Sequence, residues 1–248
     1  MIIWKNDTWG NIIIDDNLRK NHLHILWKSG SWKTKLLYNM IMQDIQNNNW
    51  IIMVDIHWDL AENVIKNIPE NRKKDLIIFY PKDIETIKNI FGLEKIFLEW
   101  KILVCNISLW QFWHEIWKSF INILLENIKQ AMFSVWKENK KKTYIYIDEF
   151  QKFQTENMLA LLFEGWNYYE YIWIIFVHQY LDQLSDEIFT YRGNNISLRD
   201  YILKIVPNKI IFAIWKYDSE TLLLDNMDLL KNEEFLLISW DEDKRGNL

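Results

Sequence analysis

The chain has 248 residues, of which 50% are hydrophobic and 25% charged, so it can bury a core as ordinary globular proteins do. Its formal net charge of -5 argues against a surface coated with nucleic-acid-binding charge, although it leaves room for a local basic groove or an oligomeric pore. The single cysteine, Cys105, excludes a disulfide framework and indicates a reducing compartment.

Neither a secretory signal nor a membrane span is visible in the sequence. The start lacks a charged segment followed by an apolar one, and no run reaches the ~18 apolar residues that a membrane span needs. We therefore expect no transmembrane segment and a cytoplasmic location, with a peripheral position at the inner membrane as the alternative.

Short apolar segments alternate with longer periodic ones, which predicts an α/β fold with a mostly parallel central sheet flanked by helices. We expect an N-terminal hairpin or extension over residues 1–20 and one large domain over residues 21–248, because no Pro- or Gly-rich linker divides the rest. The expected strands are residues 22–26, 51–55, 75–79, 101–106, 143–148, 171–177 and 209–213, with a last strand at an edge over 235–239. The expected helices are residues 35–46 and 112–135, where apolar side chains recur every three or four positions.

The first core strand is followed by a segment that resembles a phosphate-binding loop. Such a loop needs Gly, four residues, Gly, Lys, and Ser or Thr between a strand and a helix. The segment matches this pattern except at its two glycine positions, which hold Trp27 and Trp32. Glycine lets the backbone turn tightly and bring its N–H groups to the phosphates, so an indole at position 32 should obstruct that approach. The residues predicted to bind nucleotide are Trp27, Lys28, Ser29, Gly30, Ser31, Trp32, Lys33 and Thr34.

Acidic residues after another core strand supply the second half of a nucleotide site. Within the predicted loop, Lys33 would balance the β- and γ-phosphate charge, and Thr34 would offer its hydroxyl to Mg²⁺. Asp148 and Glu149 follow the apolar strand TYIYI, so Asp148 is placed to hold Mg²⁺ and Glu149 to orient the attacking water. Gln179, after the strand YIWIIFVH, would sense the γ-phosphate or position that water. We therefore predict ATP and Mg²⁺ as ligands, with Lys33, Glu149 and Gln179 in catalysis.

In this order the motifs resemble the HerA/FtsK superfamily of RecA-like P-loop ATPases, and most closely the type IV secretion coupling proteins of the TraD/TraG type. The similarity covers residues 21–239 and includes the segment DIHWDL (residues 55–60), where relatives often have DPHGDL, and the segments IDEFQKF and HQYLDQL. The resemblance implies a RecA-like fold and a homo-oligomer, typically a hexamer, that drives DNA through a central pore in conjugation or type IV secretion.

Two departures from the family are visible. Relatives usually carry a long helical insertion before the strand at residue 101, and here only about twenty residues remain. Ala213 stands where many relatives have an arginine, so no arginine finger is assigned; Lys216, Arg192 and Arg199 are weak substitutes.

Tryptophan is unusually frequent and glycine unusually rare. The chain has 15 Trp and 6 Gly, although glycine ordinarily makes up about 7% of residues. Trp27, Trp32 and Trp58 all occupy motif positions where glycine is expected. One hypothesis is that UGA codons are read as glycine by the organism, so that an alternative genetic code restores these glycines. The other is a protein truly rich in tryptophan, with a degenerate site.

Two functions from different classes follow from these alternatives. The first is an ATP-hydrolysing DNA motor, and the second is a non-catalytic nucleotide-binding or scaffolding subunit of a secretion or conjugation apparatus. A small-molecule kinase would need an Arg-rich lid, and an ABC-type ATPase would need an LSGGQ-like signature; neither is visible.

The histidines carry weaker signals. His22 and His24 share one strand face, but without a third ligand nearby packing is favoured over a metal pair. For His57, a role at the edge of the site and simple loop packing are equally supported, and His178 is interpreted as structural.

Overall fold

The computed structural model describes residues 2–6, 10–14, 16–27, 32–80, 99, 101–107, 114–135, 142–168, 172–184, 188–212, 218, 222 and 235–238. The loop residues 28–31, Ala213, Lys216 and the Lys-rich segment before Lys142 lie outside these ranges. Most of the segment between Tyr80 and Lys101 also lies outside the described ranges; this is the short segment that stands where relatives carry a long helical insertion.

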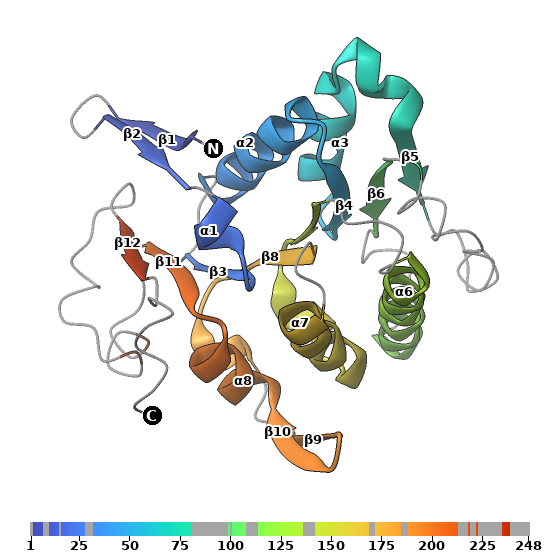
Figure 1. The fold of residues 1–248 in the computed structure, drawn as a ribbon, viewed down its shortest axis with the longest axis vertical. Helices are drawn as coiled ribbons and strands as arrows, with labels where there is room; N and C mark the ends of the chain where they lie inside the picture. The colour runs from blue at the N-terminus through green and yellow to red at the C-terminus, as the bar shows by residue number, and fades with distance from the viewer. Residues whose placement is uncertain are drawn as a thin grey trace.

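In the described part of the chain, eight strands form the main sheet (Figure 1). Their order is β12-β11-β3-β8-β7-β4-β6-β5, and every neighbouring pair is parallel except β11 with β12 at one edge. This is the α/β sheet that the sequence predicts, and the observed ends lie within two residues of the expected ones. The strands are β3 (Leu23–Leu26), β4 (Trp50–Asp55), β5 (Leu76–Phe79), β6 (Ile102–Asn106), β7 (Thr143–Ile147), β8 (Ile172–His178), β11 (Asn208–Phe212) and β12 (Phe235–Ile238).

Helices cover both faces of this sheet (Figure 1). α2 (Trp32–Gln46) and α3 (Asp59–Asn67) pack on one face. The other face carries α6 (His114–Val135), α7 (Glu156–Tyr168) and α8 (Leu198–Ile205). The described ranges also contain the short helical segments α1 (Asp16–Arg19), η1 (Glu70–Asp75), η3 (Phe150–Phe153) and η4 (Leu181–Gln183). α2 and α6 confirm the two expected helices, whereas α3, α7 and α8 were not anticipated.

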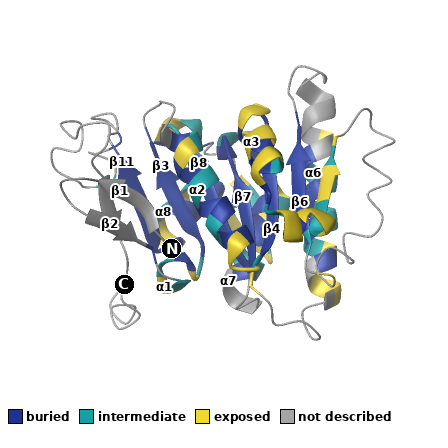
Figure 2. Cartoon of the chain, turned by 90° about the horizontal axis from the view of Figure 1, so that it is seen from above, coloured by how far each residue is buried: buried dark blue, intermediate teal, exposed yellow. Residues whose placement is uncertain are grey.

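The alternation of strand side chains produces two core layers. On β4, Ile52 and Val54 pack with α6 and α7, whereas Ile51 and Met53 pack with α2 and α3. Because both faces are covered, the strand is buried along its whole length, as a near-continuous apolar run predicts. In Figure 2 the central strands are coloured as buried, while exposed residues gather on the outer sides of the helices.

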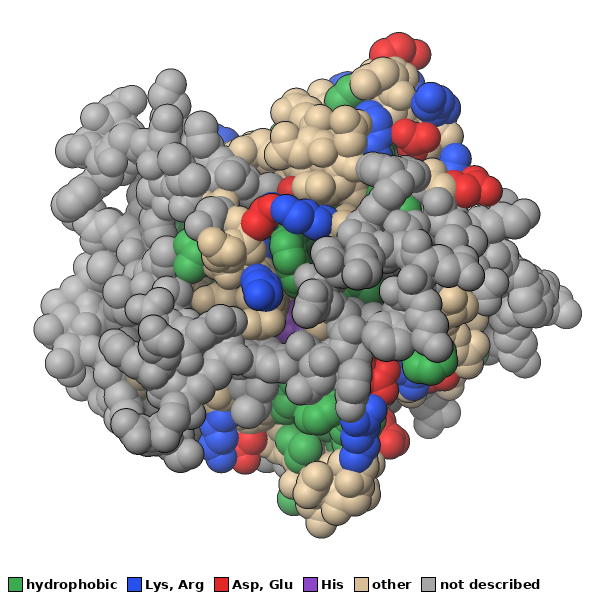
Figure 3. All heavy atoms as spheres, viewed as in Figure 1, with side chains coloured by type: hydrophobic (Ala, Val, Ile, Leu, Met, Phe, Trp, Pro, Cys, Tyr) green, Lys and Arg blue, Asp and Glu red, His purple; other side chains and the backbone are tan. Residues whose placement is uncertain are grey.

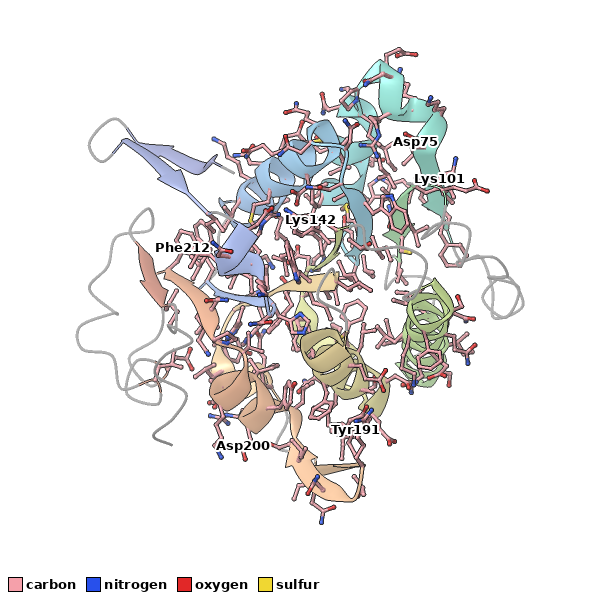
Figure 4. The ribbon with its side chains drawn as sticks, in the orientation of Figure 1. Asp75, Lys101, Lys142, Tyr191, Asp200 and Phe212 are labelled. Atoms are coloured by element: carbon pink, nitrogen blue, oxygen red, sulfur yellow. The ribbon has the colours of Figure 1, made fainter. Side chains whose placement is uncertain are left out.

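Within the described residues, two hairpins lie outside the main sheet. β1 (Ile2–Asn6) and β2 (Gly10–Ile13) pair as an antiparallel two-stranded sheet at the N-terminus, and β1 contacts α2. β9 (Ile188–Tyr191) and β10 (Asn194–Ser197) form a second hairpin beside α7, which the sequence did not reveal. Figure 4 shows Tyr191 on this hairpin, where its hydroxyl donates a hydrogen bond to Glu164 Oε1 at 2.7 Å.

A buried polar cluster joins α1, α2 and β7 at the end of the sheet where β7 begins. Arg19 is 2% exposed and donates hydrogen bonds to Asp44 Oδ2 at 2.6 Å and Tyr144 Oη at 2.9 Å. The hydroxyl of Tyr146 donates a hydrogen bond to the same Asp44 oxygen. Lys142, labelled in Figure 4, forms an ion pair with Asp16 at the rim of this cluster. The cluster fixes α1 relative to α2 and β7.

None of the helices in the described ranges is long and apolar enough to cross a membrane.

Candidate nucleotide site

The predicted site residues meet where neighbouring strands end. β8, β7 and β4 are adjacent in the sheet, and Gln179, Asp148 and Asp55 stand at their carboxyl ends. Lys33 and Thr34 come from the first turn of α2, which follows β3, the strand on the other side of β8. The carboxyl edge of a parallel sheet is where α/β proteins bind ligands, and the topology brings four separate segments to this one location.

A cleft of about 370 Å³ occupies this location. Its lining includes the five side chains for which the sequence predicts a catalytic or metal-binding role, together with four residues around the β4–α3 turn. The lining residues are Lys33, Thr34, Asp55, His57, Asp59, Leu60, Asp148, Glu149 and Gln179.

Lys33 is held between two carboxylates. Its side-chain nitrogen lies 2.8 Å from Asp148 Oδ1 and also pairs with Glu149 Oε1, while only 6% of the residue is exposed. Burial alone would lower the pKa of Lys33, but the two acidic neighbours outweigh it and raise that pKa above its ordinary value. Lys33 is therefore a fixed cation at the head of α2, at the end of the helix that favours anions.

Glu149 lies between the other two predicted catalytic residues, since it contacts both Lys33 and Gln179. It adopts a left-handed backbone conformation (φ 51°, ψ 51°) two residues after the end of β7, and its N–H donates to Asp148 Oδ1 at 2.8 Å. Its carboxylate accepts hydrogen bonds from Gln151 Nε2 at 2.6 Å and Gln179 Nε2 at 3.3 Å. Burial acts to raise the pKa of Glu149, but the ion pair with Lys33 prevails and lowers it, so the group is a carboxylate at neutral pH.

Asp55 organises the turn between β4 and α3, a role that the sequence analysis missed. Its two carboxylate oxygens accept hydrogen bonds from the N–H groups of His57 and Ala61, both at 2.8 Å. The residue is fully buried, and this burial raises the pKa of its carboxyl group against the two hydrogen bonds. The sequence does contain a signal for Asp55: it is an acid at the end of an apolar strand, the same pattern that identifies Asp148.

His57 lies at the edge of the site. Its Nε2 is 4.0 Å from Glu149 Oε1, and its side chain is 56% exposed. Of the two interpretations that the sequence left open for His57, the geometry favours the one at the edge of the site.

Trp58 occupies a strained turn beside this cleft. Its φ of 69° and ψ of -42°, with a hydrogen bond from Asp59 N–H to His57 O at 2.8 Å, define a γ-turn with positive φ at the central residue. This form of γ-turn is rare and strained for residues with a Cβ atom, whereas glycine adopts positive φ freely.

Trp27, in contrast, is accommodated as a core residue. It is 1% exposed and stacks on Phe212, with ring centroids 3.5 Å apart. Of the predicted phosphate-binding residues, Lys28, Ser29, Gly30 and Ser31 lie outside the described ranges. Trp32 is the first residue of α2, so the helix begins where the motif requires.

The residues present fit a magnesium ion that is bound together with a nucleotide. Mg²⁺ prefers oxygen ligands and usually combines one or two protein groups with substrate phosphates. Thr34 and Asp148 line the same cleft and supply a hydroxyl and a carboxylate. Among the described residues no cluster of three or more His, Cys, Asp or Glu side chains forms a metal site of its own, which is compatible with this shared mode of binding.

The other residues considered from sequence have different surroundings. His22 is packed in the core, where its Nε2 donates to Leu162 O at 2.8 Å and its Nδ1 accepts from Ile174 N–H at 3.0 Å. Arg192 lies 3.8 Å from Glu164, and Arg199 lies 3.6 Å from Asp182.

The parallel sheet, its flanking helices and this cleft define a RecA-like P-loop NTPase fold. No protein-family model matches the chain, and no curated protein sequence does either. Solved structures do resemble it. VirB4 of Thermoanaerobacter pseudethanolicus is 11% identical with a TM-score of 0.57, and the similarity covers 97% of this chain and 96% of that one.

Two further solved structures share the fold. The plasmid coupling protein TrwB, in complex with the non-hydrolysable GTP analogue GDPNP, is 11% identical with a TM-score of 0.58, over 90% of this chain and 79% of that one. The genome packaging NTPase B204 from Sulfolobus turreted icosahedral virus 2, in complex with AMP, is 10% identical with a TM-score of 0.54. The similarity covers 88% of this chain and 92% of that one. These likenesses confirm the resemblance to HerA/FtsK-type P-loop ATPases at the level of the fold.

Proposed function

We propose that this chain is an ATP-hydrolysing motor of the coupling-protein or packaging kind. One observation carries the proposal: the cleft at the carboxyl edge of the sheet brings together Lys33, Thr34, Asp148, Glu149 and Gln179, which come from three separate segments of the chain. A helix start with a lysine and a hydroxyl, facing an Asp-Glu pair, is the donor set that phosphoryl transfer from a nucleotide needs.

We infer a separate role for each of these side chains. Lys33 would exchange its pairing with Glu149 for the β- and γ-phosphates, because a phosphate offers the buried ammonium a stronger anionic partner. Glu149, released from that pairing, would accept a hydrogen bond from the attacking water, and Gln179 would hold the same water from the end of β8. Mg²⁺, held by Thr34 and Asp148, would supply charge neutralisation at the phosphates. Catalysis would then consist mainly of positioning and electrostatic stabilisation.

DNA is the proposed polymer, and a homo-oligomer, most simply a hexamer, the proposed working form. Support comes from the kinds of protein that share the fold, which include a plasmid coupling protein and a genome packaging NTPase. In Figure 3, cations on the described part of this face are interspersed with acidic side chains and form no uniform basic patch. Following the family resemblance, we place DNA contact in a pore between subunits, in conjugation or type IV secretion. The proposal also includes a cytoplasmic location, peripheral to the inner membrane, where membrane-associated partners of the secretion apparatus would lie.

Glycine at positions 27, 32 and 58 is part of this proposal. The γ-turn at Trp58 supports it, because its backbone has the conformation that glycine prefers. Mass spectrometry of the native protein tests it directly, and UGG codons at these three positions would contradict it.

A non-catalytic nucleotide-binding or scaffolding subunit is the second candidate. The packing of Trp27 on Phe212 favours it, since an indole that fits the core at the first motif position is compatible with a degenerate loop. ATP turnover by protein made with tryptophan and by protein made with glycine at the three positions separates the two functions.

The decisive experiment measures ATP hydrolysis with and without DNA. We expect DNA to stimulate the wild-type protein, and Glu149→Gln to bind ATP while losing at least about 100-fold in kcat, because the carboxylate that orients water is gone. Glu62→Gln, on the exposed side of α3, removes one charge of the same type outside the cleft and should hydrolyse as wild type does. Unchanged turnover in Glu149→Gln would remove Glu149 from the mechanism, and no turnover in either form of the wild type would leave the scaffolding function.

A further inference from the structure

Two buried histidines connect the strand before the predicted loop with the strand before Gln179. His24 lies on β3 and His178 ends β8, and these strands are parallel neighbours. Their Nε2 atoms are 2.7 Å apart, and their rings are nearly parallel, with 6° between the planes. His178 is fully buried and His24 is 1% exposed, so water does not compete for this contact.

The surrounding groups determine which nitrogen of each ring carries the hydrogen. His178 Nδ1 lies 3.0 Å from Tyr180 O, and a carbonyl oxygen can only accept, so Nδ1 is the donor. Burial lowers the pKa of His178 to about 4 and that of His24 well below its ordinary value, so both rings are neutral at pH 7. His178 Nε2 is therefore an acceptor, and His24 Nε2 must be the donor.

This chain of hydrogen bonds ends at the turn that presents Gln179. His178 and Tyr180 flank Gln179, so the bond from His178 Nδ1 to Tyr180 O closes the turn around it. From the other side, Gln183 Oε1 accepts hydrogen bonds from the N–H groups of Gln179 at 2.8 Å and Tyr180 at 3.2 Å. The backbone on both sides of Gln179 is thus held, while its side chain lies 3.3 Å from Glu149 Oε1.

We propose that His24 and His178 are positioning residues that set the orientation of Gln179 for ATP hydrolysis, with His24 acting through His178. The inference rests on the proposed ATPase function. Neither imidazole lines the cleft, so their effect passes through the turn at residues 178–180. The same pair connects this turn to β3, the strand that leads into the predicted phosphate-binding loop. It therefore fixes the position of Gln179 relative to the start of that loop.

The test compares one donor-removing and one donor-retaining variant of His24. His24→Leu has no hydrogen to give to His178 Nε2, and we expect kcat for ATP to fall about tenfold while the KM for ATP stays within about twofold. His24→Gln carries an N–H at a position similar to that of Nε2 and should recover most of kcat. A loss confined to kcat is the result that a merely structural role would not give.

His22 provides a matched control. It is also a buried, neutral imidazole beside the start of β3, but its hydrogen bonds go to Leu162 and Ile174. His22→Leu should therefore lower the urea midpoint about as much as His24→Leu, while kcat per nucleotide-binding site stays at the wild-type value. Equal losses of kcat in His22→Leu and His24→Leu, or unchanged kcat in His24→Leu, would overturn the inference.

A measurement on the unaltered protein separates this inference from the proposed function. Nitrogen-15 NMR of the histidine rings should show hydrogen on Nδ1 of His178 and on Nε2 of His24, whether or not the protein hydrolyses ATP. The opposite tautomers would overturn the hydrogen-bond chain. If His24→Leu does not fold, His178→Asn replaces it: its amide retains the bond to Tyr180 O but loses the link to His24, and a kcat equal to wild type would contradict a role for His24.

Discussion

Trp58 shows how one backbone angle limits the choice of residue. The γ-turn there orients His57 toward the cleft and starts α3, and its positive φ imposes strain on any residue with a Cβ atom. The indole itself is 40% exposed, and its ring lies against that of Tyr80 with the centroids 5.5 Å apart. Little packing therefore opposes replacement by glycine.

We expect Trp58→Gly to stabilise the protein by about 1 kcal/mol, because relief of the turn outweighs the lost contact and the greater chain entropy of glycine. Urea unfolding measures this change. Trp50→Gly is the control, since Trp50 is 3% exposed on β4 and its removal should cost about 3–5 kcal/mol. A loss of stability in Trp58→Gly would show that the turn does not need glycine.

The attachment of α1 to α2 and β7 depends on the ion pair between Arg19 and Asp44. Asp44 is fully buried and also accepts hydrogen bonds from Tyr146 and from Asn49 Nδ2, the latter at 2.9 Å. We expect Asp44→Ala to cost about 3–5 kcal/mol in urea unfolding, because it leaves the Arg19 guanidinium buried without its main anionic partner.

An exposed ion pair provides the comparison. Glu70 and Lys73 pair on η1, with side chains 86% and 54% exposed. Glu70→Ala should change the unfolding free energy by less than about 0.5 kcal/mol, because water solvates both partners well. Similar costs for Asp44→Ala and Glu70→Ala would mean that burial of the Arg19 cluster contributes little.

Buried histidines make the whole molecule sensitive to acid. Burial lowers the pKa of His22 and of His178 from 6.5 to about 4. Between these values the unfolded chain binds protons that the folded chain does not, so stability falls as the pH falls from 6.5 toward 4, by up to about 3 kcal/mol per histidine. Urea midpoints from pH 7.5 to 4.5 should show this decline, and His22→Gln should flatten it. A constant midpoint between pH 7 and 5 would contradict it.

Much of the fold could be predicted because apolar patterns mark buried strands. The run at residues 143–147 and the run at residues 172–178 are buried along their whole length in the structure, as their continuous apolar character indicates. The hairpin of β9 and β10 escaped prediction because its residues alternate only weakly and are half exposed. Its place is set by contacts such as that of Tyr191 with Glu164, which are far apart in sequence.

Spacing within a strand-to-helix motif, and acids at strand ends, are local patterns, so the sequence could name Lys33, Thr34, Asp148, Glu149 and Gln179 as site candidates, and all five line one cleft. Local patterns do not show which distant groups face one another. The order of strands in the sheet brings β3, β8, β7 and β4 side by side. This order produces the ion pair of Lys33 with Glu149 and the contact of His24 with His178, and it places the turn held by Asp55 beside them. Hydrogen bonds and desolvation act over a few ångströms in space, so the ionisation and tautomers of these groups follow from that arrangement and not from their spacing along the chain.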